Sequence, residues 1–332
     1  MIDVKKITYS YIVTTADGGR HDITKLVQDG GWEEGKGELA SHINGKAVNG
    51  KVNGKLLSSV MRNGCLVRIL ASAGGKKKEV ARGTLVDWQP SLNGSTKNDF
   101  EFGAYDNLYS LQESSDNLYF TKGTKTKAAL QSIFKKYKLP VSVYQGPDVA
   151  HAKMAFKSRK LSEIILEILD EAHTKGGKKC IIRGVKGKIQ VIPKGSNADI
   201  YHFSRDETKV VQYKQSTSGM VTRVKVIGQA DDDGKAGTVA VVDGNTKYGI
   251  RQQIYTKPKD DSTEAAKKEA EKILKEKGTV SKTMTVESPD VPYIRKGDKV
   301  HVDVGALHGY FYVAAIRHYT NAATMTMELE HI

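Results

Sequence analysis

The sequence predicts an α+β protein that is mainly β, with two small antiparallel β-barrel domains flanking a central α+β unit. Short runs of alternating apolar and polar residues, separated by Gly-rich turns, occupy both ends of the 332-residue chain. Apolar residues at helical spacing concentrate between them, and the length suffices for two or three domains. We therefore expect domains at residues 1–105, 106–198 and 199–332, with an extra helix at 262–277 inserted before the last strands.

The N-terminal part reads as strands joined by turns. "KKITYSYIVTT" and "RHDITKLVQ" flank the turn signal "ADGG". Three Asn-Gly-Lys triplets follow, beginning at Asn44, Asn49 and Asn53, which predict either tight hairpins or one mobile loop. Residues 64–88 predict a hairpin, and "NDFEFGAYD" a further strand.

The middle of the chain changes period. Leu130, Ile133 and Phe134 share one face of a helix that Pro140 ends. A clearer apolar stripe runs along "KLSEIILEILDEAHTKGG", which predicts a helix terminated near Gly176. "KCIIRGVKGKIQVIPKG" then predicts a hairpin that turns at "GVKGK".

Strands return in the C-terminal part. "VTRVKVIGQ" alternates, and the helix at 262–277 has Asp261 as its expected N-cap and Gly278 as its terminator. Four strands complete the chain, and in one of them Val300 and Val302 are expected to be buried. Three consecutive aspartates at 231–233 lack the spacing of an EF-hand loop and predict a solvated loop tip.

One hairpin pattern occurs near both ends. "NGCLVRIL" at 63–70 and "KGDKVHVD" at 296–303 each place a Gly before an alternating strand, so that Val67 corresponds to Val300. The same comparison matches Trp88 with His318. A chance likeness between two antiparallel hairpins is the alternative. If the likeness is real, two similar modules can pair through their edges, and three chains would close a ring with approximate sixfold symmetry.

Charge and composition restrict the classes of function. The net charge is +14, and residues 122–188, with 16 Lys and Arg and 5 Asp and Glu, carry +11 of it. A basic segment predicts a nucleic acid, an acidic protein partner or a solvated face. Few aromatic residues accompany the lysines, which argues against a base-stacking groove. No run of about 18 apolar residues is present, so we expect no membrane span and synthesis in the cytoplasm.

No pattern nominates catalytic or metal-binding residues. The nine histidines form neither an HxxxH nor an HxH pair, and Cys65 and Cys180 stand apart from any ligand set, so we expect buried free thiols. We therefore predict a protein that is not an enzyme and has no catalytic residues, no metal and no cofactor. A cell-wall hydrolase with two facing carboxylates is the enzymatic alternative.

The chain resembles the XkdQ/YqbQ-like tail hub proteins of contractile phages and defective prophages. The resemblance spans about residues 60–330 and rests on a series of segments: "VARGTLVDWQP", "FEFGAYDNLYSLQES", "LQSIFKKYKLP", "AFKSRKLSEIILEILDEA", "FSRDETKVVQYKQSTSGMVTRVKVIG" and "IRKGDKVHVDVGALHGYFYVAAIRHY". The first 60 residues match this pattern less well.

The resemblance implies a structural hub in the baseplate of a contractile phage or phage-derived particle. It implies a homotrimer that adapts the hexameric tail tube to the trimeric central spike, with other baseplate proteins as further partners and no membrane. A basic nucleic-acid-binding β-barrel protein is the alternative function, although we do not expect nucleic acid as a partner. We place the interface on module edges near 64–88 and 295–319, with five candidate residues: Arg82, Trp88, Arg295, Arg317 and His318.

Overall fold

The computed structural model describes residues 3–92, 98–229, 234–258 and 261–332. It divides into two compact units. The first comprises 1–211 and 285–332, and the second comprises 212–284. The aspartate run at 231–233 lies outside the described residues, so the loop expected there stays a prediction.

The N-terminal part of the first unit is an antiparallel sheet. Its strands are β1 (Ile7–Thr14), β2 (Arg20–Asp22), β3 (Val27–Glu34), β4 (Ser41–Val48), β7 (Leu66–Ala73), β8 (Lys78–Leu92) and β9 (Asn98–Tyr105). Small elements complete it: η1 (Val4–Lys6), β5 (Lys51–Val52), β6 (Lys55–Leu56) and α1 (Leu57–Val60). The expected hairpin at 64–88 is confirmed as β7 and β8.

The three Asn-Gly-Lys triplets adopt different local structures. Only the third makes a two-residue hairpin turn, between β5 and β6, where Asn53 and Gly54 both have positive φ. Asn44 and Gly45 lie inside β4, paired with β3 and β9. The backbone N–H of Ser58 donates to the side chain of Asn49. Neither a series of hairpins nor one loop therefore describes this segment.

Helices and two small sheets form the central part. Its elements are α2 (Tyr109–Glu113), β10 (Ser115–Phe120), α3 (Thr126–Lys136), β11 (Val141–Tyr144), β12 (Met154–Lys160), α4 (Leu161–Thr174), β13 (Cys180–Val185) and β14 (Lys188–Pro193). The apolar faces predicted for α3 and α4 are buried in one core with α2 and β14. α3 ends before Lys138, whose φ is positive, and Pro140 follows. The β13–β14 hairpin turns where expected.

The C-terminal strands of the sheet are β15 (His202–Ser204), β16 (Val210–Ser216), β20 (Ser281–Pro289), β21 (Lys299–Val304), β22 (Leu307–Tyr319) and β23 (Thr324–His331), with η2 (Arg205–Glu207) after β15. Val300 and Val302 are both fully buried, as their alternation predicted. β21 and β22 form the second predicted hairpin.

The second unit has its own small core. It contains β17 (Arg223–Ile227), β18 (Thr238–Asp243), η3 (Thr246–Tyr248), β19 (Gln252–Thr256) and α5 (Thr263–Lys277). α5 packs on the sheet through Ala266, Ala270 and Leu274. Its N-cap is Ser262 rather than the expected Asp261, and Gly278 is its C-cap as predicted. The unit begins within β16 and ends within β20.

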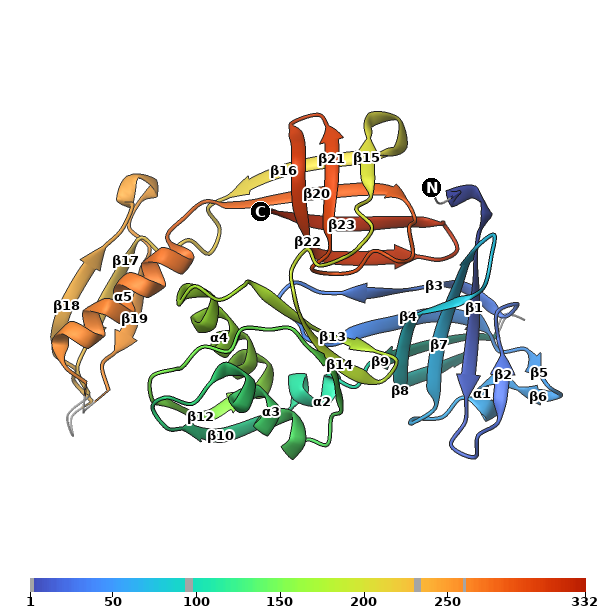
Figure 1. The fold of residues 1–332 in the computed structure, drawn as a ribbon, viewed down its shortest axis with the longest axis horizontal. Helices are drawn as coiled ribbons and strands as arrows, with labels where there is room; N and C mark the ends of the chain where they lie inside the picture. Colours follow the sequence, from blue (N-terminus) through green and yellow to red (C-terminus); the bar gives the residue numbers. More distant parts are fainter. Residues whose placement is uncertain (1–2, 93–97, 230–233, 259–260) are drawn as a thin grey trace. The chain divides into compact units, whose positions relative to one another are not determined.

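The mainly β architecture with helices is confirmed, but closed barrels are not found among the described residues. The hydrogen-bonded strand path is open and runs β16-β20-β23-β22-β3-β4-β9-β8-β7-β1-β2, with β21 and β15 branching from β22. The two ends were expected to close on themselves. Instead β22 pairs with β3, because the edge of one module is satisfied by the edge of the other. Figure 1 shows these first and last parts of the chain side by side.

The two ends nevertheless share a strand order. We call β3-β4-β9-β8-β7-β1 the N module and β16-β20-β23-β22-β21-β15 the C module; the hydrogen-bonded neighbours follow in corresponding order. Each has a long strand, β8 or β22, between a shorter hairpin partner and the strand that follows it. The modules differ at one edge, since β1 is antiparallel to β7 whereas β15 is parallel to β21.

The same turn leads into both hairpins. Gly64 has φ +89° and donates its N–H to the Leu85 carbonyl over 2.9 Å, and Gly297 has φ +85° and donates to the Val313 carbonyl over 2.7 Å. Both long strands then skip one residue in pairing with the next strand, immediately after Leu85 and Val313. These matches confirm that Val67 corresponds to Val300.

The bulge also corrects one expected correspondence. Counting on from Leu85 and Val313 through the shared bulge makes Trp88 correspond to Ile316, and Pro90 to His318. The match of Trp88 with His318 is therefore wrong by two residues. The sequence comparison aligned aromatic rings across hairpin turns of unequal length, which the backbone pairing does not support.

Candidate assembly site

The contact between the two modules is a short antiparallel ladder. Four residue pairs join β22 to β3, from Ile316 opposite Glu34 to Tyr319 opposite Gly31. The ladder continues as Thr320 donates its N–H to the Gly30 carbonyl over 2.9 Å. Strand pairing of this kind fixes both the distance and the register of the two modules within one chain.

Two stacked rings lie at the centre of this ladder. Trp32 of β3 and His318 of β22 have ring centroids 4.0 Å apart and planes 12° apart. The His318 side chain has no solvent exposure, and its Nδ1 lies 2.6 Å from the Asp290 carboxylate. Its Nε2 lies 3.1 Å from the Ile294 carbonyl, which can only accept, so Nε2 is the donor. The ring therefore joins β22 to the segment between β20 and β21.

Tyrosines from β1 reach the same place. The hydroxyl of Tyr9 donates to Asp290, and burial beside that carboxylate raises the pKa of Tyr9. The Tyr11 hydroxyl lies 2.7 Å from Thr320 Oγ1, and burial raises the pKa of Tyr11 as well. Both tyrosines stay neutral. They connect β1 of the N module to Asp290, between β20 and β21, and to Thr320, directly after β22.

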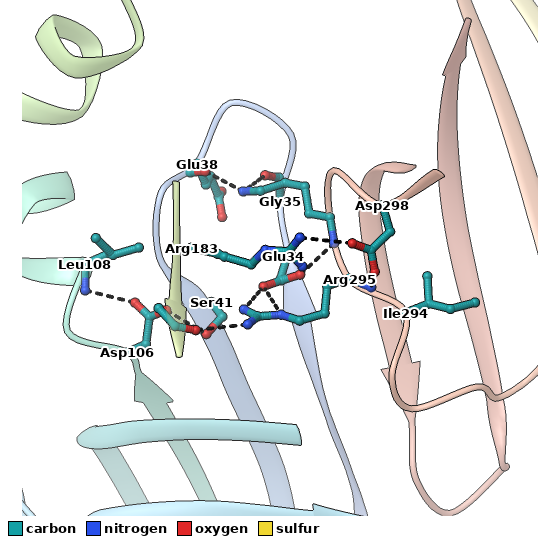
Figure 2. Close-up of polar contacts among 12 residues, drawn as sticks. Glu34, Gly35, Glu38, Ser41, Asp106, Leu108, Arg183, Ile294, Arg295 and Asp298 are labelled. Carbon is teal, nitrogen blue, oxygen red and sulfur yellow. Dashed lines mark hydrogen bonds and ion pairs between the residues drawn. The ribbon is translucent and has the colours of Figure 1, made fainter. Parts of the chain in front are cut away.

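A buried ion-pair network stands beside the ladder. The Glu34 side chain at the end of β3 is 4% exposed and is paired with the Arg295 guanidinium, which is 19% exposed. Burial alone would raise the pKa of Glu34, but Arg295 outweighs it and the pKa falls to about 2. The backbone N–H of Lys296 also donates to Glu34 over 2.7 Å. Figure 2 shows the Glu34 carboxylate facing Arg295.

The central part of the chain contributes to this network. Arg183 of β13 donates to Asp298 over 3.0 Å, and Arg295 donates from Nη1 to the Gly184 carbonyl over 3.0 Å. The Asp298 side chain is 8% exposed, and burial raises its pKa. The 295–298 turn of the C module thus contacts β3 of the N module and β13 of the central part at once (Figure 2).

Asp106 is a further buried acidic group in this region. It is 8% exposed and accepts hydrogen bonds from the Ser41 hydroxyl (3.0 Å) and the Leu108 N–H (2.9 Å). Burial raises its pKa to about 6, and those hydrogen bonds only partly oppose the shift. It lines a pocket of about 180 Å³ that Arg82 and Arg295 also line.

The five sequence-predicted interface residues fall into two groups. Arg295 and His318 are held by the chain's own Glu34 and Asp290, so their side chains act inside the protomer. Arg82, Trp88 and Arg317 are partly exposed and stay predictions for contacts with other chains. Arg82 is paired with Glu79 in its own strand.

Trp88 and Arg317 line one groove. It has a volume of about 640 Å³ and crosses β3, β4, β8, β9 and β22. Trp88 stacks on Phe100 with centroids 5.7 Å apart, and the Arg62 guanidinium lies 4.8 Å above its ring. Arg317 reaches Glu33 over 3.6 Å and lies over the ring of Tyr319. The structure therefore places two candidate residues, one from each module, on one surface.

Sequence reasoning missed Glu34, Trp32, Asp290 and Arg183. Their partners are about 28 to 286 residues away in the chain, so no local spacing identifies them. One signal was available. Gly30 and Gly31 precede Trp32, and a Cβ on Gly31 would lie 1.8 Å from the His318 carbonyl oxygen. A Gly-Gly pair within a strand marks such a close approach of another backbone.

The described residues contain no group of three or more His, Cys, Asp or Glu side chains arranged to hold a metal ion. Cys65 and Cys180 are both free. None of the helices in the described ranges is long and apolar enough to span a bilayer.

Comparison with known proteins identifies both the fold and the family. Two tail proteins share the fold at a TM-score of 0.65: the 43 kDa tail protein of prophage MuSo2 from Shewanella oneidensis, with 12% identity over 97% of this chain and 98% of that one, and the tail protein from Neisseria meningitidis MC58, with 14% identity over 97% and 96%. A chain of the Francisella PdpA–VgrG complex is similar over 98% of this chain and 57% of its own, with 9% identity and a TM-score of 0.55.

The sequence identity to one uncharacterised protein is higher than to these solved structures. YqbQ of Bacillus subtilis (strain 168) is 22% identical over 265 residues, which cover 77% of this chain and 78% of YqbQ. The profile of the YqbQ-like family matches residues 40–331, most of the chain, from β4 to β23. The shared fold of phage tail proteins and this match agree, and the chain belongs to the YqbQ-like family.

Proposed function

We propose that this protein is a structural, non-catalytic hub of the tail baseplate of a contractile phage or phage-derived particle. Three copies would form a ring that joins a hexameric tail tube to a trimeric spike. The observation that carries the proposal is the pair of like-ordered modules joined by β22 and β3. Three protomers of this form present six similar modules, and a closed heterologous ring is the usual result of such contacts.

The buried junction supports a rigid protomer. Glu34, Arg295 and Asp298 join the N module, the C module and the central part through buried charges. Separating these parts would leave charges unpaired in a poorly hydrated site. An adapter needs such rigidity, because the spacing of its modules must match a tube above and a spike below.

The basic central part fits protein assembly in this proposal. Charge complementarity steers the association of protein subunits, and an acidic face of a tube or other baseplate protein would be the complementary partner. The same charge is what favours the alternative of nucleic-acid binding, through sequence-independent attraction to phosphates.

Size-exclusion chromatography with light scattering tests the proposal on the full chain, followed by electron microscopy of negatively stained particles. We expect a trimer, or a monomer that trimerises as concentration rises, and rings with threefold symmetry. A stable dimer that binds DNA with a steep salt dependence would support the nucleic-acid alternative instead. Degradation of cell walls in a zymogram would contradict the non-catalytic role.

A further inference from the structure

One edge of the C module is covered within the chain. Residues 316–319 of β22 have β23 on one side and β3 on the other. Three of the four β3 residues in this contact, Gly31, Trp32 and Glu34, are buried, with Trp32 2% exposed. This edge therefore shows how one module receives a strand from another.

The corresponding edge of the N module has no strand on it among the described residues. β8 pairs with β9 along 84–92, but its pairing with β7 ends at Thr84. On that side Gly64 and Asn63 reach the carbonyls of Leu85 and Val86, and the described pairing goes no further. Trp88 is only half-buried, whereas Ile316, its counterpart in the C module, is 2% exposed. The difference is what removal of a covering strand would produce.

The C module has a matching outer strand that is not covered. β16 is the counterpart of β3 in the strand order and stands at the end of the described sheet path. Four consecutive residues in it, 212–215, are exposed, among them Tyr213 at 43%. Each module thus has one donor strand, β3 or β16, and one acceptor edge, on β8 or β22. Only the donor β3 and the acceptor edge of β22 meet inside the chain.

We propose that β16 of one protomer pairs antiparallel with residues 87–90 of β8 in a second copy of this chain, reproducing the contact of β3 with β22. The inference rests on the proposed ring and deepens it by naming the surface through which protomers join. Repeated three times, this contact alternates with the three internal ones and closes a circle of six modules.

The register follows from the strand ends. Glu34 pairs with Ser41, the first residue of β4. At the matching place the side-chain hydroxyl of Ser281, the first residue of β20, donates to the Ser216 carbonyl over 3.0 Å. We therefore infer that Ser216 corresponds to Glu34, and Gln215 to Glu33. Since Arg317 lies opposite Glu33 and corresponds to Gln89, the contact places Gln89 opposite Gln215 of the next copy.

Pro90 limits how far this ladder extends. It corresponds to His318, and it has no N–H to donate to a neighbouring strand. The hydrogen bond of Thr320 to Gly30 shows that the residues in phase with His318 direct their N–H groups toward β3. The contact between protomers therefore has at least one hydrogen bond fewer than the internal one. A proline on this edge also discourages pairing with unrelated strands.

Disulfide cross-linking of the full chain tests the proposal. Gln89→Cys is combined in turn with Lys214→Cys, Gln215→Cys and Ser216→Cys, and each protein is oxidised at a concentration where light scattering reports a trimer. We expect most of the Gln89→Cys/Gln215→Cys chains to become covalent dimers and trimers on a non-reducing gel. The yield of covalent product with Cys at 215 should exceed the yields with Cys at 214 and at 216 at least severalfold. The reason is that Cβ atoms are closest at directly opposite positions outside the hydrogen-bonded pairs.

Matched controls separate proximity from general reactivity. Each single variant should give little covalent dimer, because Cys65 is buried and burial raises the pKa of the Cys180 thiol to about 11. Gln89→Cys with Arg20→Cys, on the exposed edge of β2, should also fail to cross-link. Glu33→Cys with Arg317→Cys should close within one chain, which verifies that this strand geometry accepts a disulfide.

The two readouts distinguish failure of the ring from failure of this contact. A trimer by light scattering that forms no cross-link at 214, 215 or 216 would overturn the contact and leave the ring standing. A chain that remains monomeric at every concentration and forms no cross-link would overturn both. Cross-links between residues 89 and 215, in a protein that is a trimer by light scattering, would support both the ring and the contact.

Discussion

Trp32 of β3 and His318 of β22 stack at a centroid distance of 4.0 Å, although the two strands lie near opposite ends of the chain. The stack is possible because Gly31 has no side chain where the His318 carbonyl passes. The joined sheet thus depends on two backbones that approach closely, with the aromatic ring of one strand covering the imidazole of the other.

Gly31→Ala should destabilise the junction. Its Cβ would lie 1.8 Å from the His318 carbonyl oxygen, so one backbone must move. We expect the free energy of unfolding to fall by about 1 to 3 kcal/mol, the usual range for overpacking. Denaturant unfolding followed by tryptophan fluorescence measures it. Gly75→Ala is the matched control, since a Cβ there meets nothing within 4 Å. Equal stability of both variants would show that the strands can separate without cost.

Glu34→Gln should lower the free energy of unfolding more than the loss of an exposed ion pair does. It removes the ion-pair partner of the Arg295 guanidinium in a buried site, and breaking a buried pair in this way typically costs about 3 to 5 kcal/mol. Glu163→Gln, in a pair with Arg159 where the glutamate is 56% exposed, is the control and should cost less than about 1 kcal/mol. Urea unfolding at pH 7 compares them. Similar costs would mean that solvent reaches Glu34.

The low pKa of Glu34 also predicts an acid dependence of stability. Its pKa is about 2 in the folded chain against an ordinary 4.5, so its contribution is complete above pH 4.5 and is lost as pH falls toward 2. The wild-type chain should lose about 3 kcal/mol more than Glu34→Gln over that interval. Unfolding free energies at a series of pH values provide the comparison, and parallel curves for the two proteins would contradict the ion pair.

Asp106 should behave in the opposite way. Its folded pKa of about 6 exceeds its ordinary 3.8, so the folded chain holds a proton that the unfolded chain has released. Stability therefore falls as pH rises from 3.8 to 6, and the cost is complete above pH 6. Asp106→Asn should gain about 2.5 kcal/mol relative to wild type between pH 4 and pH 8. Thermal unfolding at both pH values tests this, and an unchanged difference between the two proteins would refute it.

Val302→Asp should unfold the C module. Val302 is fully buried in β21, and an unpaired charge there costs several kcal/mol, on the order of the stability of a whole domain. Asp303→Asn, at the next and exposed position, is the control and should leave the melting temperature nearly unchanged. Differential scanning fluorimetry compares the two, and an unaltered melting curve for Val302→Asp would exclude the burial described above.

Local patterns determined the secondary structure. The apolar stripes of α3, α4 and α5 and the alternation of β21 predicted the buried faces, because helical and strand periods are properties of the chain itself. The repeated Gly before each hairpin likewise predicted the shared turn, since a positive φ favours glycine wherever the turn occurs. Family likeness was also present in the order of these segments.

Only the tertiary structure decided how the modules meet. The sequence predicted two closed barrels, whereas the described strands of the two modules lie in one open sheet in which β3 completes the edge of β22. Glu34, Asp290 and Arg183 gained their roles from partners far along the chain. Strand edges carry no side-chain signature of their partner, because backbone hydrogen bonds are the same for every residue but proline. Register and partner are therefore set by packing and burial across the whole sheet.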